Sequence, residues 1–179
     1  MSIMIQTKAL PMAFCEQEYS FSMEAKTIPK RKVIWSIHKE TPLPFGLSMS
    51  ETGIISGTPL RIQQVSVQIY ATANNPSEIT YCILNLNVYE QLKIQMKESW
   101  EIFIDIFNEI VLTATGGIPP YSWSCDSLPI GLTLEKDIIK GQPQASGGIS
   151  PIKISVEDSF GNKRSHLFQL KIYNTRRFP

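Results

Sequence analysis

The sequence predicts an all-β protein made of two tandem antiparallel β-sandwiches, and three observations support this prediction. Short segments alternate between apolar and polar residues, as in VSVQIYATA (65–73) and HLFQLKIY (166–173). These segments are rich in Val, Ile, Tyr and Phe, and Gly, Pro, Asn or Asp interrupts them about every 8–12 residues, a pattern typical of sandwich strands. The whole pattern also occurs twice, which predicts two domains of the same kind.

The repeat aligns nearly the whole chain with itself. Residues 3–25 lie without gaps on residues 92–114, and a single-residue gap then brings Trp35 onto Trp123. The last strands align as LNLNVY (84–89) on FQLKIY (168–173). We expect both tryptophans in the core between the sheets, where burial of so large a side chain contributes a few kcal/mol.

The join between the copies lies near Glu90 and contains no run of Gly, Ser or Pro. We therefore expect one domain at residues 1–90 and a second at residues 91–179, with limited freedom between them.

One segment fits two kinds of secondary structure. In SWEIFIDIFNEIV (99–111) the apolar residues are compatible with the stripe of an amphipathic helix as well as with a strand. Its counterpart in the first copy, LPMAFCEQEYSF (10–21), carries Pro11 and is a poor helix. The repeat therefore favours a strand in both copies.

The segment LPFGLSMSETGIISGTP (43–59), nearly copied as LPIGLTLEKDIIKGQP (128–143), predicts a small hairpin in each domain. Pro44 favours an extended residue before it and a turn, so a strand begins just after it. Gly53 lies where the hairpin turn needs a positive φ, and Pro59 ends the pairing because it has no N–H to donate.

Several ordered motifs resemble those of the putative Ig domain family, which is close to dystroglycan-type cadherin-like domains. Repeats of this family run through Gly-Gly-x-Pro-Pro-Tyr-x-Trp, Leu-Pro-x-Gly-Leu and a late Asp-x-x-Gly. The second copy matches with TGGIPPYSW (115–123), LPIGL (128–132) and VEDSFGN (156–162), and the first with its 43–59 hairpin. The resemblance implies two tandem Ig-like/cadherin-like sandwiches of a kind found mostly in extracellular and cell-surface proteins.

The two copies depart from the family pattern at different turns. The first copy has TIPKRKVIW (27–35) in place of the Gly-Gly-x-Pro-Pro-Tyr turn and ATANNPS (71–77) in place of the Asp-x-x-Gly turn. The second copy has lost the Thr-Gly of its hairpin in EKDIIKG (135–141). We expect the fold to tolerate these changes, and we expect function where the copies differ.

Composition excludes some classes of partner. The net charge is +1, and the only terminal concentration of charge is the pair Arg176 and Arg177, so we expect no nucleic-acid partner. No stretch is long and apolar enough for a membrane span, and the N-terminal sequence lacks the features of a signal peptide. We expect no membrane insertion. The location stays open, because the resemblance implies an extracellular or cell-surface one, whereas the sequence shows no signal peptide.

The sequence does not favour an enzyme. Its two histidines, His38 and His166, belong to no motif of a nucleophile with a base, and there is no GxSxG, HExxH or phosphate-binding glycine loop. Three cysteines, Cys15, Cys82 and Cys125, are expected to be buried free thiols in strands, with a disulfide or a reactive thiol as alternatives. We expect no catalytic or cofactor-binding residue.

The resemblance makes calcium a candidate ligand, because cadherin-like relatives place carboxylates at the seam between domains. Calcium takes about six to eight oxygen ligands, and the join YEQLKIQ lacks an Asp-rich motif. The weak candidates are the adjacent Glu157 and Asp158. The alternative is that Asp158 shapes a turn with Ser159 and Gly161.

Exposed aromatic residues are the candidate anchors for a partner protein or a glycan. Phe107, Tyr121, Phe160 and Tyr173 could fill this role, and PKRK (29–32) is either a basic contact loop or a solvated one. We expect a protein partner or self-association, with a glycan as a further candidate.

These observations favour a non-enzymatic tandem module for protein–protein or adhesive binding, or a spacer within a larger surface protein. The alternative is a structural or assembly subunit of a virion, tail, envelope or other complex that associates through sheet edges. Calcium-dependent adhesion is less favoured.

Overall fold

A computed structural model describes residues 2–74, 77–145 and 148–174 of the chain. The described residues form strands and no helix, as the alternation predicts. The chain divides into two compact units, Met1–Gln91 and Leu92–Pro179, here called the first and second domains. Part of the ATANNPS departure, residues 75 and 76, and the basic pair Arg176 and Arg177 lie outside the described residues.

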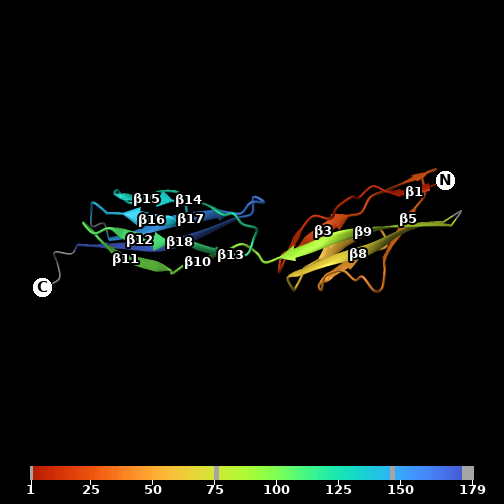
Figure 1. The fold of residues 1–179 in the computed structure, drawn as a ribbon, viewed down its shortest axis with the longest axis horizontal. Coiled ribbons are helices and arrows are strands. Elements are labelled where there is room, and N and C mark those ends of the chain that lie inside the picture. The colour runs from red at the N-terminus through yellow and green to blue at the C-terminus, as the bar shows by residue number, and fades with distance from the viewer. Residues whose placement is uncertain (1, 75–76, 146–147, 175–179) are drawn as a thin grey trace. The chain divides into compact units, whose positions relative to one another are not determined.

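The first domain contains three sheets, shown in Figure 1. Their strand orders are β2-β9-β8-β5, β3-β7-β6 and β1-β4. The strands are β1 (Ser2–Ile5), β2 (Ala13–Phe14), β3 (Tyr19–Ser22), β4 (Ala25–Ile28), β5 (Val33–Ile37), β6 (Leu47–Met49), β7 (Ile54–Gly57), β8 (Gln63–Ala73) and β9 (Glu78–Tyr89).

The second domain repeats this arrangement strand by strand. Its orders are β11-β18-β17-β14, β12-β16-β15 and β10-β13, the same as those of the first domain with each strand number raised by nine. The strands are β10 (Lys93–Gln95), β11 (Ser99–Phe103), β12 (Asn108–Val111), β13 (Thr113–Thr115), β14 (Ser122–Cys125), β15 (Leu132–Glu135), β16 (Ile138–Gly141), β17 (Gly148–Glu157) and β18 (Lys163–Tyr173).

Each sandwich includes one parallel pair of strands in addition to the predicted antiparallel pairs. β2 runs parallel to β9 with Phe14 opposite Tyr89, and β11 runs parallel to β18 with Phe103 opposite Tyr173. The ring centroids lie 6.3 Å and 6.0 Å apart, respectively. Period-two alternation is the same in both strand directions, so the sequence pattern alone does not predict a parallel pair.

The ambiguous segment 99–111 forms two strands, β11 and β12, joined by a turn. Asp105 in this turn has a φ of 60°, and Glu16, its counterpart in the repeat, also has a φ of 60°. The strand prediction is therefore confirmed, and the left-handed residue ends the first strand before any helical stripe can form.

The predicted hairpins are confirmed in both domains as β6–β7 and β15–β16. Gly53 has a φ of 89°, in the region that favours glycine, as expected for the turn. Gly46, with a φ of 97°, lies so close to the carbonyl oxygen of Thr58 that a side chain there would overlap it.

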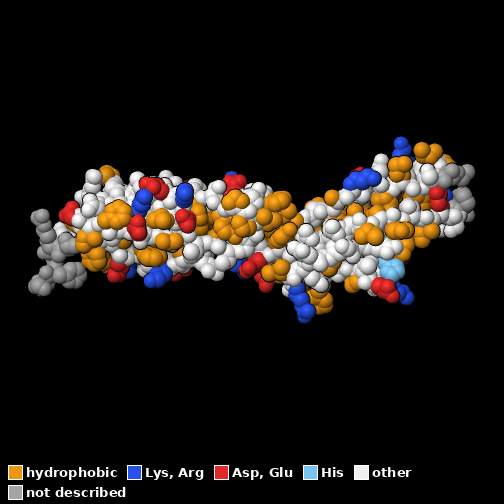
Figure 2. Space-filling model, in the orientation of Figure 1, with side chains coloured by type: hydrophobic (Ala, Val, Ile, Leu, Met, Phe, Trp, Pro, Cys, Tyr) orange, Lys and Arg blue, Asp and Glu red, His pale blue; other side chains and the backbone are white. Residues whose placement is uncertain are grey.

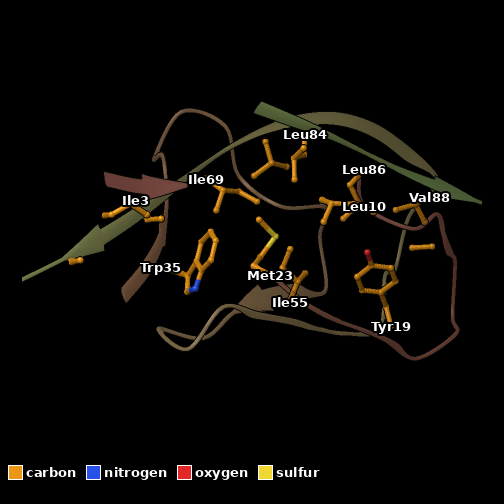
Figure 3. Close-up of a cluster of buried hydrophobic side chains, with 14 residues drawn as sticks. Ile3, Leu10, Tyr19, Met23, Trp35, Ile55, Ile69, Leu84, Leu86 and Val88 are labelled. Atoms are coloured by element: carbon orange, nitrogen blue, oxygen red, sulfur yellow. The ribbon is translucent and has the colours of Figure 1, made fainter. Parts of the chain in front are cut away.

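Each domain encloses its own hydrophobic core. In the first, Trp35 is 5% exposed and points into a cluster with Met23, Ile69 and Leu86 (Figure 3). Trp123 packs against the core of the second domain but is only half-buried. The prediction that both tryptophans lie within the core is thus correct for Trp35 and only partly correct for Trp123.

The three cysteines are free thiols and are half-buried. Cys82 and Cys125 lie in strands as predicted, whereas Cys15 lies in the turn after β2. Burial raises the pKa of the Cys82 and Cys125 thiols, which keeps them in the less reactive protonated form. No helix among the described residues is long and apolar enough to cross a membrane.

Candidate protein-binding surface

The outer face of the sheet β2-β9-β8-β5 carries large apolar side chains that are open to solvent. Leu84, Leu86 and other inward residues of β9 are buried, so the alternate residues of this strand face outward. The outward residues at its first half are Ile79, Tyr81 and Ile83, which are 65%, 58% and 61% exposed. Figure 2 shows hydrophobic side chains gathered over the part of the first domain where Figure 1 draws β9.

Tyr70 on β8 extends this group across the sheet. It lies directly opposite Tyr81, with ring centroids 5.8 Å apart, and His38 lies on its other side at 6.0 Å. The side-chain amide of Gln68 donates a hydrogen bond of 2.9 Å to the Tyr70 hydroxyl. Neighbouring rings and this hydrogen bond restrict the Tyr70 side chain, which lowers the entropic cost of using it in an interface.

We call Tyr70, Ile79, Tyr81 and Ile83 the apolar face. The outward positions of β8 from 66 to 72 and of β9 from 79 to 87 carry no charged side chain. The face therefore offers an uncharged, aromatic and aliphatic surface, the composition typical of the centre of a protein–protein interface.

The PKRK loop lies beside the start of β9, and its arginine is not a free basic group. Arg31 forms an ion pair with Glu78, whose other carboxylate oxygen accepts a 3.2 Å hydrogen bond from the Ile3 amide. The Arg31 hydrogen bond holds the pKa of Glu78 below its ordinary value. Lys30 and Lys32 are exposed. The predicted basic patch is thus reduced to two lysines, because the sequence does not reveal that Glu78 faces the loop.

The second domain has the same strands, but most of its outward positions equivalent to the apolar face are polar. The register makes three cross-strand pairs equivalent: Thr72–Ile79 to Glu157–Lys163, Tyr70–Tyr81 to Ser155–Ser165, and Gln68–Ile83 to Lys153–Leu167. Glu157 and Lys163 form an ion pair at 3.1 Å, and the Ser155 and Ser165 hydroxyls hydrogen-bond at 2.8 Å. Leu167 is the exposed aliphatic residue of this group. The apolar face is therefore specific to the first domain.

The aromatic residues singled out in the sequence lie elsewhere. Phe107 and Phe160 are exposed in turns, Tyr173 is 39% exposed at the end of β18, and Tyr121 is half-buried. The apolar face was missed because its members lie within strands that alternation assigns to the core. The available signal was the run ITYCIL (79–84), in which Ile79, Tyr81 and Ile83 share one face while Cys82 and Leu84 are apolar on the other, so burial of one face leaves the other apolar group outside.

The two calcium candidates have protein partners of their own. Asp158 is 4% exposed, and its carboxylate accepts hydrogen bonds from the amides of Ile118 (3.0 Å), Phe160 (2.9 Å) and Asn162 (2.9 Å), and from the Asn162 side chain (2.8 Å). Burial raises the pKa of Asp158, but these hydrogen bonds outweigh it and hold the pKa below its ordinary value. Asp158 thus shapes the turn, with the Gly161 amide donating to its carbonyl, while Glu157 pairs with Lys163.

The two histidines lie in separate domains. His38 belongs to the first domain and His166, whose Nε2 is buried, to the second. Across the described ranges, no three His, Cys, Asp or Glu side chains are arranged to hold a metal ion.

Solved structures resemble the chain in fold. Extracellular domains 3–5 of Drosophila OTK match with a TM-score of 0.62 and 14% identity, over 96% of this chain and 62% of that one. An I-band fragment of titin matches with a TM-score of 0.55 and 13% identity, over 96% of this chain and 66% of that one. The chain thus spans less than two thirds of either structure, and identities this low support the fold alone. No curated protein matches the chain significantly in sequence.

A family match covers the first domain. Residues 4–88 match the model of the family described as putative Ig domain, a span that covers most of the strands of this domain. The second domain repeats its sheet orders. The chain is therefore a tandem of two immunoglobulin-like domains, the first of which is similar to the putative Ig domain family.

Proposed function

We propose that the chain is a non-enzymatic binding module that recognises another protein through the apolar face of its first domain. The observation that supports this most is the exposure of Ile79, Tyr81 and Ile83 on a scaffold whose second copy carries polar residues at two of the three equivalent positions. Solvent-exposed apolar side chains grouped on one face are typical of interaction sites. Ig-like domains are typical modules of extracellular recognition and adhesion, which agrees with this proposal.

The partner surface that fits this face is uncharged and apolar. A charged partner group would lose hydration against Ile79 and Ile83 without gaining an opposite charge. Tyr70 and Tyr81 combine large rings with hydroxyl groups, so they can anchor an apolar contact and hydrogen-bond at its rim. A stable contact needs about 800 Å² from each partner, so the neighbouring polar residues of β8 and β9 would form its margin.

The test uses residues that the second domain already tolerates. The variant Ile79→Lys with Tyr81→Ser copies the second-domain residues Lys163 and Ser165 into the first domain, so we expect it to fold. Affinity capture from the native source, followed by mass spectrometry, should recover a partner with the wild-type chain and lose it with this variant. The matched control is Leu167→Lys, which changes an exposed residue of the second domain and should retain the partner. Equal recovery by all three chains would refute the proposal.

Assembly through sheet edges is the second candidate, and one observation favours it. Within the described residues, β2 pairs with only Val88 and Tyr89 of β9, so the rest of β9 pairs with a strand, β8, on one side only. Such edges can add a strand from another chain. Sedimentation of the purified chain distinguishes the two proposals, because self-association that survives the Ile79→Lys, Tyr81→Ser change would favour the edges over the apolar face.

A further inference from the structure

A cleft of about 500 Å³ lies beside Trp123 in the second domain. It is lined by Tyr121, Ser122, Trp123, Lys136 and Asp137. The two aromatic residues are half-buried, and the other three are exposed, so the cleft opens to solvent. Its size lies within the range of small-molecule sites in proteins.

In the first domain, the β6–β7 hairpin covers the equivalent tryptophan, Trp35. The Trp35 amide donates a 3.0 Å hydrogen bond to the carbonyl of Glu51 in the hairpin turn. A Cβ placed on Gly53 would lie 2.6 Å from Cδ1 and 2.7 Å from Nε1 of Trp35. The glycine backbone therefore packs directly on the indole, which is 5% exposed and points into the core in Figure 3.

The corresponding hairpin of the second domain is shorter and has no glycine in its turn. Two residues, Lys136 and Asp137, join Glu135 to its partner Ile138, whereas residues 51–53 join Ser50 to Ile54 in the first domain. The turns remain equivalent, because the Asp137 carbonyl accepts from the Leu112 amide (2.7 Å) as the Gly53 carbonyl accepts from the Met23 amide (2.9 Å). A Cβ at the position of Gly53 does not fit against the indole, so Asp137 cannot seal Trp123 in the same way.

The other lining residues also differ between the copies. Counting from the shared tryptophan, Tyr121 and Ser122 stand where the first domain has Val33 and Ile34. Trp123 is thus the only lining side chain that the two domains share. The cleft is a property of the second copy rather than of the fold.

The aromatic wall of the cleft is held in place by neighbouring turns. The Tyr121 hydroxyl donates a 2.6 Å hydrogen bond to the Gly116 carbonyl. The loop between them is tied to the Asp158 turn, since the Ile118 amide donates to Asp158 and the Ile118 carbonyl accepts from the Ser159 amide at 2.9 Å. Lys136 and Asp137, in contrast, have no side-chain partner within the described part of the chain. The site therefore combines ordered rings with charged groups that are free to bind.

We propose that this cleft binds a saccharide, an inference that goes beyond the protein-binding function proposed above and does not depend on it. The C–H faces of a pyranose ring are apolar and pack on the negatively polarised face of an indole or phenol ring. Its hydroxyls both donate and accept, so they match the Asp137 carboxylate, the Lys136 ammonium and the Ser122 hydroxyl at once. A quaternary ammonium ligand fits less well, because Lys136 would repel it.

The test is a titration of the purified chain with chitohexaose, cellohexaose and mannohexaose, followed by calorimetry and by tryptophan fluorescence. We expect saturable binding of at least one oligosaccharide with a change in fluorescence. Asp137→Ala should weaken that binding about tenfold or more, the equivalent of about 1.4 kcal/mol. Tyr121→Ala should weaken binding similarly. Because Asp137 is exposed, we expect Asp137→Ala to fold as the wild type does.

The matched control is Thr52→Ala, an exposed change in the hairpin turn of the first domain, which should leave binding unchanged. A graft that replaces Glu135-Lys136-Asp137 with Ser-Glu-Thr-Gly should close the cleft and abolish binding while the domain stays folded. The proposal is overturned if none of the three oligosaccharides binds at about 10 mM, or if Asp137→Ala binds as the wild type does. It is also overturned if an extended proline peptide (decaproline) or a quaternary ammonium (choline) binds at this cleft and the oligosaccharides do not.

Discussion

The two domains share a strand order and a repeat, yet they expose different chemistry. In the first, the sheet face carries Tyr70, Ile79, Tyr81 and Ile83, and the tryptophan is sealed by a glycine turn. In the second, the same face is polar, and the tryptophan lines an open cleft. The fold depends on the inward positions, which both copies keep apolar, while outward positions and turns are free to acquire function.

The largest effect on stability is expected when the second-domain turn residue is moved into the first domain. Gly53→Asp should destabilise the first domain by about 2–5 kcal/mol, because the side chain both overlaps Trp35 and requires a left-handed backbone. Hydrogen exchange measured by mass spectrometry on peptides of each domain separates this loss from any effect on the second domain. The reciprocal change Asp137→Gly is the control, and it should alter stability by less than about 1 kcal/mol. Equal effects would mean that Gly53 does not seal Trp35.

The Asp158 turn offers a second contrast, since four hydrogen bonds converge on this carboxylate in the second domain. Asp158→Ala should destabilise that domain by about 2–4 kcal/mol, because three backbone amides and one side-chain amide lose their charged acceptor. The folded pKa of Asp158 is depressed, so its contribution to stability is complete above the unfolded pKa of about 3.9 and is lost as pH falls through the lower folded pKa.

Urea unfolding between about pH 2 and pH 5 measures this linkage. The wild-type second domain should lose stability toward the acidic end of this range, and Asp158→Asn should flatten the part of the curve due to this group. Glu157→Gln, next to it on β17, is the control and should have a smaller effect because its ion pair with Lys163 is largely exposed. An unchanged pH profile in Asp158→Asn would refute the assigned role.

The smallest expected effect concerns calcium. Because the Asp158 oxygens already accept four hydrogen bonds and Glu157 pairs with Lys163, we expect a few millimolar calcium to leave the melting temperature within about 1 °C of its value in chelator. Differential scanning calorimetry with and without calcium measures this. Magnesium at the same concentration is the control for ionic strength, and a rise specific to calcium would restore calcium-dependent adhesion as a candidate.

Much of the fold could be predicted because it is carried by repeating local signals. The alternation of Val67, Ile69 and Ala71, the glycine of the hairpin turn and the Asp158 turn each act over a few residues and occur where expected. The parallel strands could not be predicted, because their pairing joins residues about 70 positions apart and depends on strand direction.

The candidate sites were harder to predict for a related reason. Whether Tyr81 is core or surface depends on which face of a strand the other sheet covers, and ITYCIL is apolar on both. The pairing of Arg31 with Glu78 links a loop to the first residue of β9, far away in sequence. The cleft beside Trp123 was signalled only indirectly, by the lost glycine of the EKD turn, whose consequence for the indole is visible only in three dimensions.

The most direct test of the central claim is side-chain footprinting of the complex with the captured partner. Hydroxyl radicals oxidise exposed side chains, so their rates report burial residue by residue. Binding should protect Tyr70, Tyr81 and Ile83 several-fold and leave Leu167, at the equivalent position of the second domain, unchanged. Protection of Leu167 with full reactivity of Tyr81 would contradict the account, because the polar face would then be the one that binds.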